Sequence, residues 1–239
     1  MGRMTPAPDY GFNACKSSLE LRLEFDDVDH KLYLLADRTV ANHQTTNMKI
    51  PASLTEKSLR ETLMRYERRI FKEDSLKKSA VLVPIVKSGH GLELLFTKRT
   101  DTVEHHKGQV SFPGGAVEPG DATLAETALR ETTEEIGLAP SAVSILGTMD
   151  DLQTPTGFII TPIVGYIHQL PPLRINNDEV AEIVRIPLEK FFDDANRRSE
   201  FRERDGVRIE VFFYDVWREP VWGATAFFVK RLVDLLHTM

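Results

Sequence analysis

The chain has 239 residues, which is enough for one large domain or two small ones. Hydrophobic residues make up 41% and charged residues 28%, and these ordinary values exclude a globally disordered or fibrous protein. The formal net charge of −6 argues against a nucleic-acid binder that relies on a broad positive field. The single cysteine, Cys15, excludes an internal disulfide and a thiolate zinc cage, and therefore favours a reducing compartment.

Membrane and export signals do not stand out in the sequence. Neither of the longest apolar runs, 80–86 and 158–167, approaches the ~18 residues that a membrane span needs, and both contain proline. The first residues also lack the apolar stretch of a secretory signal. We therefore expect a cytoplasmic protein with a small-molecule substrate and with neither a nucleic acid nor a membrane as partner.

Residues 1–47 differ in character from the rest of the chain. Residues 19–25 alternate strictly between apolar and polar, and 31–35 could return as a second strand after an acidic turn. A polar stretch, 42–47, then runs directly into Met48. The segment is expected to be either a peripheral hairpin or translated upstream sequence ahead of a start at Met48, and the main domain is expected to span 48–239.

The rest of the chain predicts helices and strands in irregular alternation. Helices are expected over 53–71, 121–136, just after Pro187, and over 225–236, and strands over 79–86, 92–97, 143–148, 158–168 and 209–216. Pro84 suggests that its strand lies at a sheet edge or bulge. An Arg-rich stretch over 197–208 interleaves acids and is expected to be a solvated hairpin rather than an RNA-binding patch. Without a regular βαβ rhythm, the pattern indicates an α+β fold with a mixed sheet covered by helices.

The helix expected over 121–136 crowds carboxylates beside its buried face. Its apolar stripe is formed by Ala125, Ala128, Leu129, Thr132 and Ile136. At ~100° per residue, Glu131 and Glu135 border this stripe and Glu134 lies just outside it. Like charges one turn apart each cost ~0.2–0.5 kcal/mol, and acids near a helix C-terminus cost roughly 0.3–1 kcal/mol more.

A solvated acidic face is the ordinary interpretation of such a cluster, but two features oppose it here. The carboxylates border the buried stripe, and the glycine pair Gly114-Gly115 leads into the same helix. Glycines let a backbone approach a ligand closely, and carboxylate oxygens suit Mg²⁺ or Mn²⁺, which bind substrate phosphates. Such a cation neutralises a diphosphate and activates water. The residues therefore predict metal-dependent phosphoanhydride hydrolysis.

The same residues resemble a known family signature. The glycine pair is followed by the string Arg130-Glu131-x-x-Glu134-Glu135-x-Gly137-Leu138. This arrangement is similar to the Nudix box of hydrolases that cleave nucleoside diphosphates linked to another moiety. The resemblance implies an α/β/α sandwich in which a loop–helix–loop holds divalent cations.

The resemblance also implies roles for individual residues. Glu131 and Glu135 would be the principal metal ligands, Glu134 would assist as ligand or base, and the Gly114 carbonyl would be a further metal contact. Arg130 would belong with the catalytic residues of the box.

The box departs from the general pattern in three places. The spacing from Gly115 to Arg130 is one residue longer, Asp121 stands near the usual first glutamate, and Thr132 takes the usual aliphatic position.

The longer spacing and several flanking strings resemble the coenzyme A diphosphatase subgroup. The strings lie at 95–99, 108–115, 150–152, 156–158, 161–162, 179–182, 186–188 and 221–226. They extend the resemblance over about residues 50–236. One mismatch is Glu104, where the subgroup usually has arginine.

Four further residues are candidates for the site. Arg99 is expected either to grip a phosphate or to form a surface salt bridge. His106 is expected either to contact substrate or to be an ordinary loop residue, and Gln109 to hold either the loop backbone or a ligand. Glu179 is a candidate general base, although an Asn-Asp-Glu string is also typical of a plain turn. Trp222 is expected to pack in the core more readily than to serve as an adenine platform.

The leading functional hypothesis is cleavage of coenzyme A or acyl-CoA to 3′,5′-ADP and (acyl-)4′-phosphopantetheine with Mg²⁺ or Mn²⁺. The alternatives are a Nudix hydrolase of ADP-ribose, a dinucleotide or a nucleoside triphosphate, and a catalytically silent Nudix-fold ligand sensor. The Glu104 mismatch favours the first alternative, while the complete set of three glutamates opposes the second. A homodimer is one option that the sequence leaves open.

Overall fold

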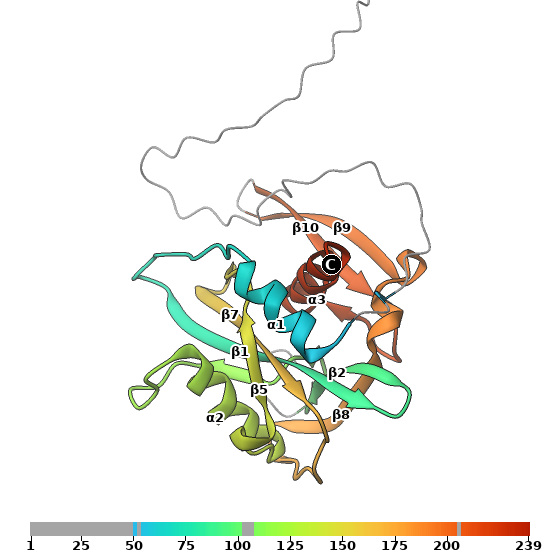
Figure 1. Ribbon diagram of the computed structural model, residues 1–239. Coiled ribbons are helices and arrows are strands. Elements are labelled where there is room, and N and C mark those ends of the chain that lie inside the picture. Colours follow the sequence, from blue (N-terminus) through green and yellow to red (C-terminus); the bar gives the residue numbers. More distant parts are fainter. Residues whose placement is uncertain (1–49, 52–53, 102–107, 205–206) are drawn as a thin grey trace, which may run out of the picture. The chain divides into compact units, whose positions relative to one another are not determined.

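The computed structural model describes residues 50–51, 54–101, 108–204 and 207–239 (Figure 1). The expected N-terminal hairpin therefore lies outside the described residues. The loop candidates Glu104 and His106 also lie outside them.

The described chain is built around one mixed sheet. Its strands are β1 (Lys77–Ser88), β2 (Gly91–Arg99), β3 (Val110–Ser111), β4 (Gly114–Ala116), β5 (Ser144–Thr148), β6 (Leu152–Gln153), β7 (Phe158–Ile167) and β8 (Val180–Pro187). β1 pairs with β7 in parallel over ten residues, and the other pairings in this sheet are antiparallel. The sheet is therefore mixed, as the irregular element order predicts.

The glycine segment lies where β1 and β2 diverge. β2 pairs with β1 only near their turn, where residues 91–94 face 85–88. Farther along, the same edge of β1 pairs with β4 at 79–81, and the same edge of β2 pairs with β3 at 97–98. The short strands β3 and β4 thus form a wedge between β1 and β2, and this wedge carries the Gly114-Gly115 pair into the sheet.

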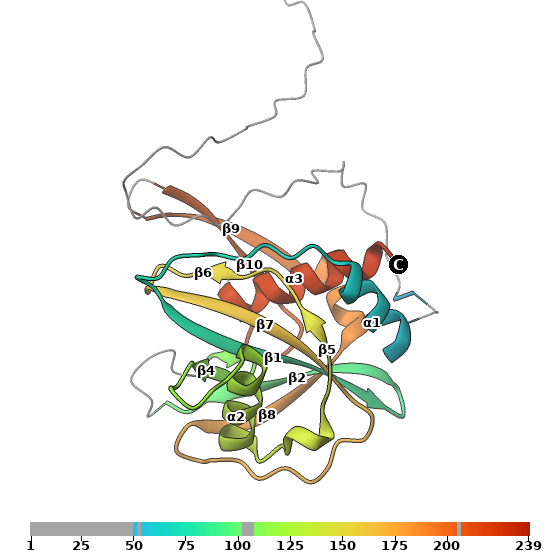
Figure 2. The same ribbon diagram turned by 60° about the vertical axis from the view of Figure 1, so that its left-hand side comes forward.

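Helices cover both faces of the main sheet (Figures 1 and 2). The helices are α1 (Glu56–Arg65), α2 (Leu124–Ile136) and α3 (Gly223–His237), and single 3₁₀ turns are formed by Pro140–Ala142, Leu188–Phe191 and Asp194–Asn196. Leu82 packs with α2, whereas its neighbour Val83 packs with α1 and α3 on the opposite face. This period of two along β1 buries both faces of the strand. The predicted α+β fold, an α/β/α sandwich with a mixed sheet, is confirmed.

A second, three-stranded antiparallel sheet consists of β9 (Arg197–Arg204), β10 (Val207–Tyr214) and β11 (Val221–Trp222). β9 and β10 form the hairpin expected from the Arg-rich stretch. Trp222 stacks on Phe213 with ring centroids 5.9 Å apart, and the Arg198 guanidinium lies 4.1 Å from the Phe213 ring centroid. Trp222 is half-buried and stacks on a protein ring, but it belongs to neither hydrophobic core cluster, so the core packing expected for it is not confirmed.

Two expectations about β1 and α1 are wrong. Pro84 lies in a central strand, although it falls between the stretches that pair with β4 and β2, where a missing N–H is tolerated. The first helix ends at Arg65 rather than 71 because buried carboxylates bind the backbone beyond it. Asp150 accepts from the Arg69 N–H at 2.8 Å, and Asp151 accepts from the Phe71 N–H at 3.1 Å.

Two other expectations need correction. The helix after Pro187 is only one 3₁₀ turn, and α2 begins at Leu124 rather than 121 because Thr123 caps it. The sequence pattern does not predict β8. Its residues alternate weakly in burial, and it becomes a strand through its antiparallel pairing with β2.

Asp151 is expected to be important for stability. It is buried, accepts a 2.7 Å hydrogen bond from the Thr161 hydroxyl, and lies 3.8 Å from the Arg68 guanidinium. Replacing it by alanine leaves these donors unpaired, so Asp151→Ala should lower the free energy of unfolding by ~3 kcal/mol. Urea denaturation measures this loss, and a variant as stable as the wild type would contradict the role of Asp151 as an anchor for the segment after α1.

Candidate active site

Helix α2 is fixed at both ends. The Thr123 hydroxyl accepts from the Glu126 N–H, and Gly137 closes the C-terminus with a φ of 68°. Beyond the helix, the backbone N–H groups of Arg174 and Asn176 donate to the Ile136 and Glu135 carbonyls, each at 2.9 Å. These bonds satisfy carbonyls that a helix end leaves free, and they bring the turn before Glu179 to the end of α2 that carries the glutamates.

Glu135 is the most buried carboxylate of the helix. Its side chain is 5% exposed, its Oε2 has no hydrogen-bond partner among the described residues, and the Gly114 N–H donates to the carboxylate. Burial raises its pKa to about 8, and the charges of Glu131 and Glu179 raise it further while Arg99 opposes the shift. A buried, repelled carboxylate with a free oxygen fits a site that a cation completes.

Glu131 lies one turn before Glu135, and its carboxylate packs against the backbone of Gly115. A Cβ atom on Gly115 would lie 2.6 Å from Glu131 Oε2, so only glycine leaves room for this carboxylate. The Gly115 carbonyl is held by the Ser79 hydroxyl at 2.7 Å. Burial raises the pKa of Glu131 and Arg130 opposes the shift, while Glu134 and Glu179 add to it.

Arg130 ties the acidic residues of this segment together. Its guanidinium donates to Asp121 at 3.0 and 3.1 Å, to Glu131 and Glu134 at 3.0 Å each, and to the Ala116 carbonyl at 3.0 Å. The Arg130 hydrogen bond is the largest cause that lowers the pKa of Asp121. Arg130 therefore positions the carboxylates, and Glu134, 57% exposed, lies at the rim of the cluster.

The remaining candidates approach the cluster from β2 and the turn before β8. Arg99 Nη1 lies 4.0 Å from Glu135 Oε1, and the Arg99 N–H donates to the Gln109 carbonyl at 3.0 Å. Glu179 is exposed, its carbonyl accepts from the Thr100 N–H at 3.0 Å, and its charge acts on both Glu131 and Glu135. The structure thus brings together Arg99, Glu179 and the α2 glutamates, with the backbone of Gln109 beside them.

These residues suit a divalent cation, although the described side chains do not form a finished cage. Within the described ranges, no three carboxylate, imidazole or thiol groups converge on one point. Glu131 and Glu134 are turned toward Arg130, whereas the free Oε2 of Glu135 has no such partner among the described residues. All the available side-chain donors are hard oxygens, which favours Mg²⁺ or Mn²⁺ over softer metals.

The sequence pattern does not predict two residues that support the site. Asp121 lies near the place of the first glutamate of the family pattern, nine residues before its partner Arg130, and this position is the signal that could reveal its role. Ser79, which anchors the Gly115 carbonyl, carried no signal because a serine at the start of a strand is unremarkable.

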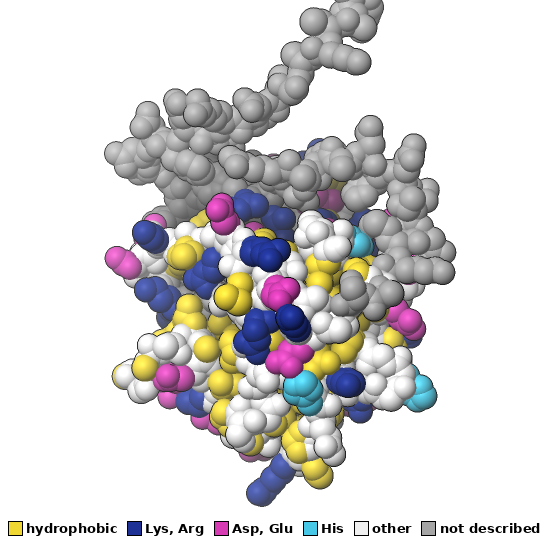
Figure 3. All heavy atoms as spheres, in the orientation of Figure 1, with side chains coloured by type: hydrophobic (Ala, Val, Ile, Leu, Met, Phe, Trp, Pro, Cys, Tyr) yellow, Lys and Arg dark blue, Asp and Glu magenta, His cyan; other side chains and the backbone are white. Residues whose placement is uncertain are grey.

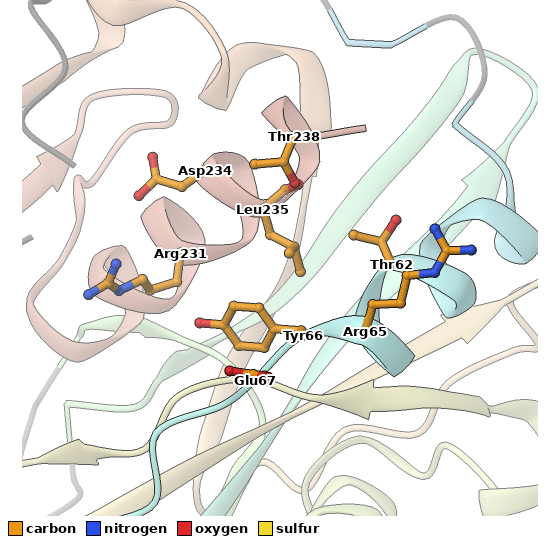
Figure 4. Close-up of a pocket in the computed structure, with 8 residues that line it drawn as sticks. All are labelled: Thr62, Arg65, Tyr66, Glu67, Arg231, Asp234, Leu235 and Thr238. Atoms are coloured by element: carbon orange, nitrogen blue, oxygen red, sulfur yellow. The ribbon is translucent and has the colours of Figure 1, made fainter. Parts of the chain in front are cut away.

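A cavity of about 540 Å³ lies elsewhere, between α1 and α3 (Figure 4). It is lined by Thr62, Arg65, Tyr66, Glu67, Arg231, Asp234, Leu235 and Thr238. None of the candidate site residues lines it. Its two arginines are accompanied by two acids, so the charges of its lining give no clear preference for an anionic ligand.

The α/β/α sandwich, with a glycine segment that leads into an acidic helix, is the arrangement that the resemblance to Nudix hydrolases implies. A NUDIX domain matches residues 76–205, which is more than half of the chain. The chain belongs to the Nudix family of hydrolases. This membership confirms the prediction of a hydrolase and supports a nucleoside diphosphate derivative as the coarse substrate class.

Curated relatives carry the same family name, and one solved structure is given after them for comparison. The chain is 35% identical over 158 residues to the uncharacterized Nudix hydrolase NudL of Yersinia pestis strain Pestoides F, covering 66% of this chain and 79% of the relative. The NudL of Yersinia pseudotuberculosis serotype O:1b matches equally well, with the same identity and coverage. A MutT/nudix family protein from Enterococcus faecalis is similar at 14% identity, with a TM-score of 0.46 over 77% of this chain and 74% of that chain.

One face of the described chain and its helices bear on the expected partners. On the face shown in Figure 3, positive and negative side chains are interspersed over the described part. Among the described helices, none is both long enough and apolar enough to cross a bilayer.

Proposed function

We propose that the chain is a Mg²⁺- or Mn²⁺-dependent diphosphatase of coenzyme A or acyl-CoA. The observation that carries the hydrolytic site is the buried carboxylate of Glu135 with its free oxygen, flanked by Glu131 and Glu179. The coenzyme A substrate rests on the strings at 95–99 and 108–115 that resemble the coenzyme A diphosphatase subgroup.

In this proposal Glu131, Glu134, Glu135 and the Gly114 carbonyl hold the cation. When bound, the cation neutralises the diphosphate and lowers the pKa of water. Arg130 positions Glu131 and Glu134 through the hydrogen bonds described above.

Residues outside the box would orient the substrate and move the proton. Arg99 binds a phosphate oxygen, and Glu179 or Glu134 accepts the proton of the attacking water. Water adds to one phosphorus while the bond from that phosphorus to the bridging oxygen breaks, which gives 3′,5′-ADP and 4′-phosphopantetheine. Gln109, and His106 outside the described residues, complete the proposed substrate contacts. The protein would work in the cytoplasm, as a monomer or a homodimer.

A second candidate is hydrolysis of another nucleoside diphosphate derivative, such as ADP-ribose. Glu104 favours it, because a carboxylate where the subgroup has arginine repels a phosphate. A silent ligand sensor is disfavoured, because a binding protein without chemistry has no need for three mutually repelling glutamates.

A substrate panel separates these candidates. Coenzyme A, an acyl-CoA, ADP-ribose and a dinucleotide are each incubated with the full chain, with Mg²⁺, with Mn²⁺ and with a chelator, and the products are separated by chromatography. We expect metal-dependent release of 3′,5′-ADP from coenzyme A. Brisk cleavage of ADP-ribose with no cleavage of coenzyme A would overturn the subgroup, and no cleavage of any substrate would favour the sensor.

A further inference from the structure

Arg99 and Glu135 face each other inside the site without forming a close hydrogen bond. Arg99 Nη1 and Glu135 Oε1 are 4.0 Å apart, and the Arg99 side chain is 28% exposed. Arg99 Nε and Glu135 Oε2 are both buried, and neither has a hydrogen-bond partner among the described residues. The two groups therefore interact by charge, but they are not locked together as a hydrogen-bonded pair would be.

Arg99 is the cation that balances Glu135 in this arrangement. Among the described residues whose charges act most on Glu135, Glu131 and Glu179 repel its ionised form and Arg99 favours it. The other nearby guanidinium, that of Arg130, is fully engaged with Asp121, neighbouring carboxylates and a backbone carbonyl.

The strand fixes the Arg99 backbone, whereas the contact of its guanidinium with Glu135, at 4.0 Å, is longer than a hydrogen bond. The Arg99 N–H donates to the Gln109 carbonyl, and the pairing of β2 with β8 shifts register between Lys98 and Arg99. Such an irregularity re-aims a side chain relative to a regular strand. Because the guanidinium makes no close hydrogen bond to Glu135, a ligand that attracts it does not have to compete with such a bond.

We propose that Arg99 is an exchangeable counter-ion, which balances the ionised form of Glu135 until the divalent cation binds and is then released to bind the phosphates of the substrate. This inference rests on the proposed function, because it needs a cation at Glu135. Arg99 and a divalent cation repel each other when both approach one carboxylate, so Arg99 must weaken cation binding before substrate arrives. The released guanidinium then favours the phosphate-bound state, which couples the two binding events.

The test measures Mn²⁺ binding without substrate, by the electron paramagnetic resonance signal of the free ion at pH 9, where Glu135, whose pKa burial raises to about 8, is largely ionised. Arg99→Met keeps an unbranched, largely apolar stem and removes the charged guanidinium. We expect Mn²⁺ to bind at least ~fivefold more tightly to this variant, the effect of one charge pair at ~4 Å in a water-like dielectric. The Mn²⁺-loaded variant should bind α,β-methylene-ADP more weakly than the Mn²⁺-loaded wild type does.

Lys98→Met is the matched control. It removes the same charge from the neighbouring position, where the ammonium group pairs with Glu219 at 2.7 Å. Its Mn²⁺ affinity should stay within ~twofold of the wild type, because Lys98 faces another carboxylate.

Whether Arg99→Met binds Mn²⁺ more tightly or more weakly than the wild type decides whether Arg99 is an exchangeable counter-ion. Equal or weaker Mn²⁺ binding by folded Arg99→Met would overturn it and make Arg99 a support of the site, while the proposed function would stand. If that variant does not fold, Arg99→Gln carries the same expectation with a polar head group. A wild-type chain that binds no Mn²⁺ would overturn the proposed function, and the exchange with it.

Discussion

Glu135→Gln is expected to lower turnover of the preferred substrate at least ~100-fold at saturating Mg²⁺, while the fold remains intact. The amide keeps the shape of the side chain but cannot supply a negative charge to a cation. The buried position of Glu135 and its free Oε2 make it the carboxylate least replaceable by solvent or by its neighbours. Steady-state turnover across a Mg²⁺ titration measures the loss, and wild-type turnover would contradict its role as a metal ligand.

The same variant should be more stable than the wild type when metal is absent, and the difference should depend on pH. Burial raises the pKa of Glu135 from its ordinary 4.5 to about 8 in the folded chain. Below pH 4.5 the carboxyl is protonated in both the folded and unfolded states, so it imposes no penalty. Between these two pKa values the unfolded state ionises while the folded state keeps its proton, so the free energy of unfolding falls as pH rises.

Above about pH 8 the whole penalty is present, and it amounts to a few kcal/mol in the wild type. Glutamine does not titrate, so Glu135→Gln should lack this fall. Urea denaturation in the presence of a chelator, at pH 5 and at pH 8.5, measures the free energy of unfolding of both proteins. If the variant lost as much stability as the wild type over this interval, another group would be responsible. Adding Mg²⁺ should stabilise the wild type much more than the variant.

The sequence predicts the helix of the site well because its signals are local. A period of 3.6 residues places Ala128, Thr132 and Ile136 on the buried side, and all three are buried. The same geometry predicts the relative burial of two glutamates correctly, since Glu135 is buried and Glu134 is exposed.

The parts that the sequence does not predict depend on contacts between distant segments. The wedge strands β3 and β4 have two and three residues, too few for any periodicity, and they form only because β1 and β2 diverge. The early end of α1 depends on Asp150 and Asp151, which lie about 80 residues farther along the chain. The approach of Arg99 to Glu135 likewise joins β2 to α2, and no spacing within either segment contains it.

Gly114 and Gly115 are adjacent, yet their replacement by alanine should have opposite consequences for fold and activity. Gly114 has a φ of 151°, and a Cβ atom there would lie 2.6 Å from Val81 Cα, a backbone atom of the central strand. Neither the dihedral angle nor the backbone can adjust easily. Gly114→Ala should therefore lower the free energy of unfolding by ~3 kcal/mol or prevent folding.

Gly115→Ala should instead keep the fold and damage the site. Its Cβ would meet the carboxylate of Glu131, the far end of a flexible side chain, with Oε2 at 2.6 Å. The carboxylate can move aside, so stability should change by less than ~1 kcal/mol, while the displaced ligand should lower turnover ~10–100-fold. Gly120→Ala is the control, because its Cβ would meet nothing within 4 Å. Thermal unfolding and turnover, measured on all three variants, separate the two effects. Normal turnover in Gly115→Ala would mean that the position of Glu131 against the glycine segment does not matter for the reaction, whereas a loss confined to turnover would tie that position to the chemistry.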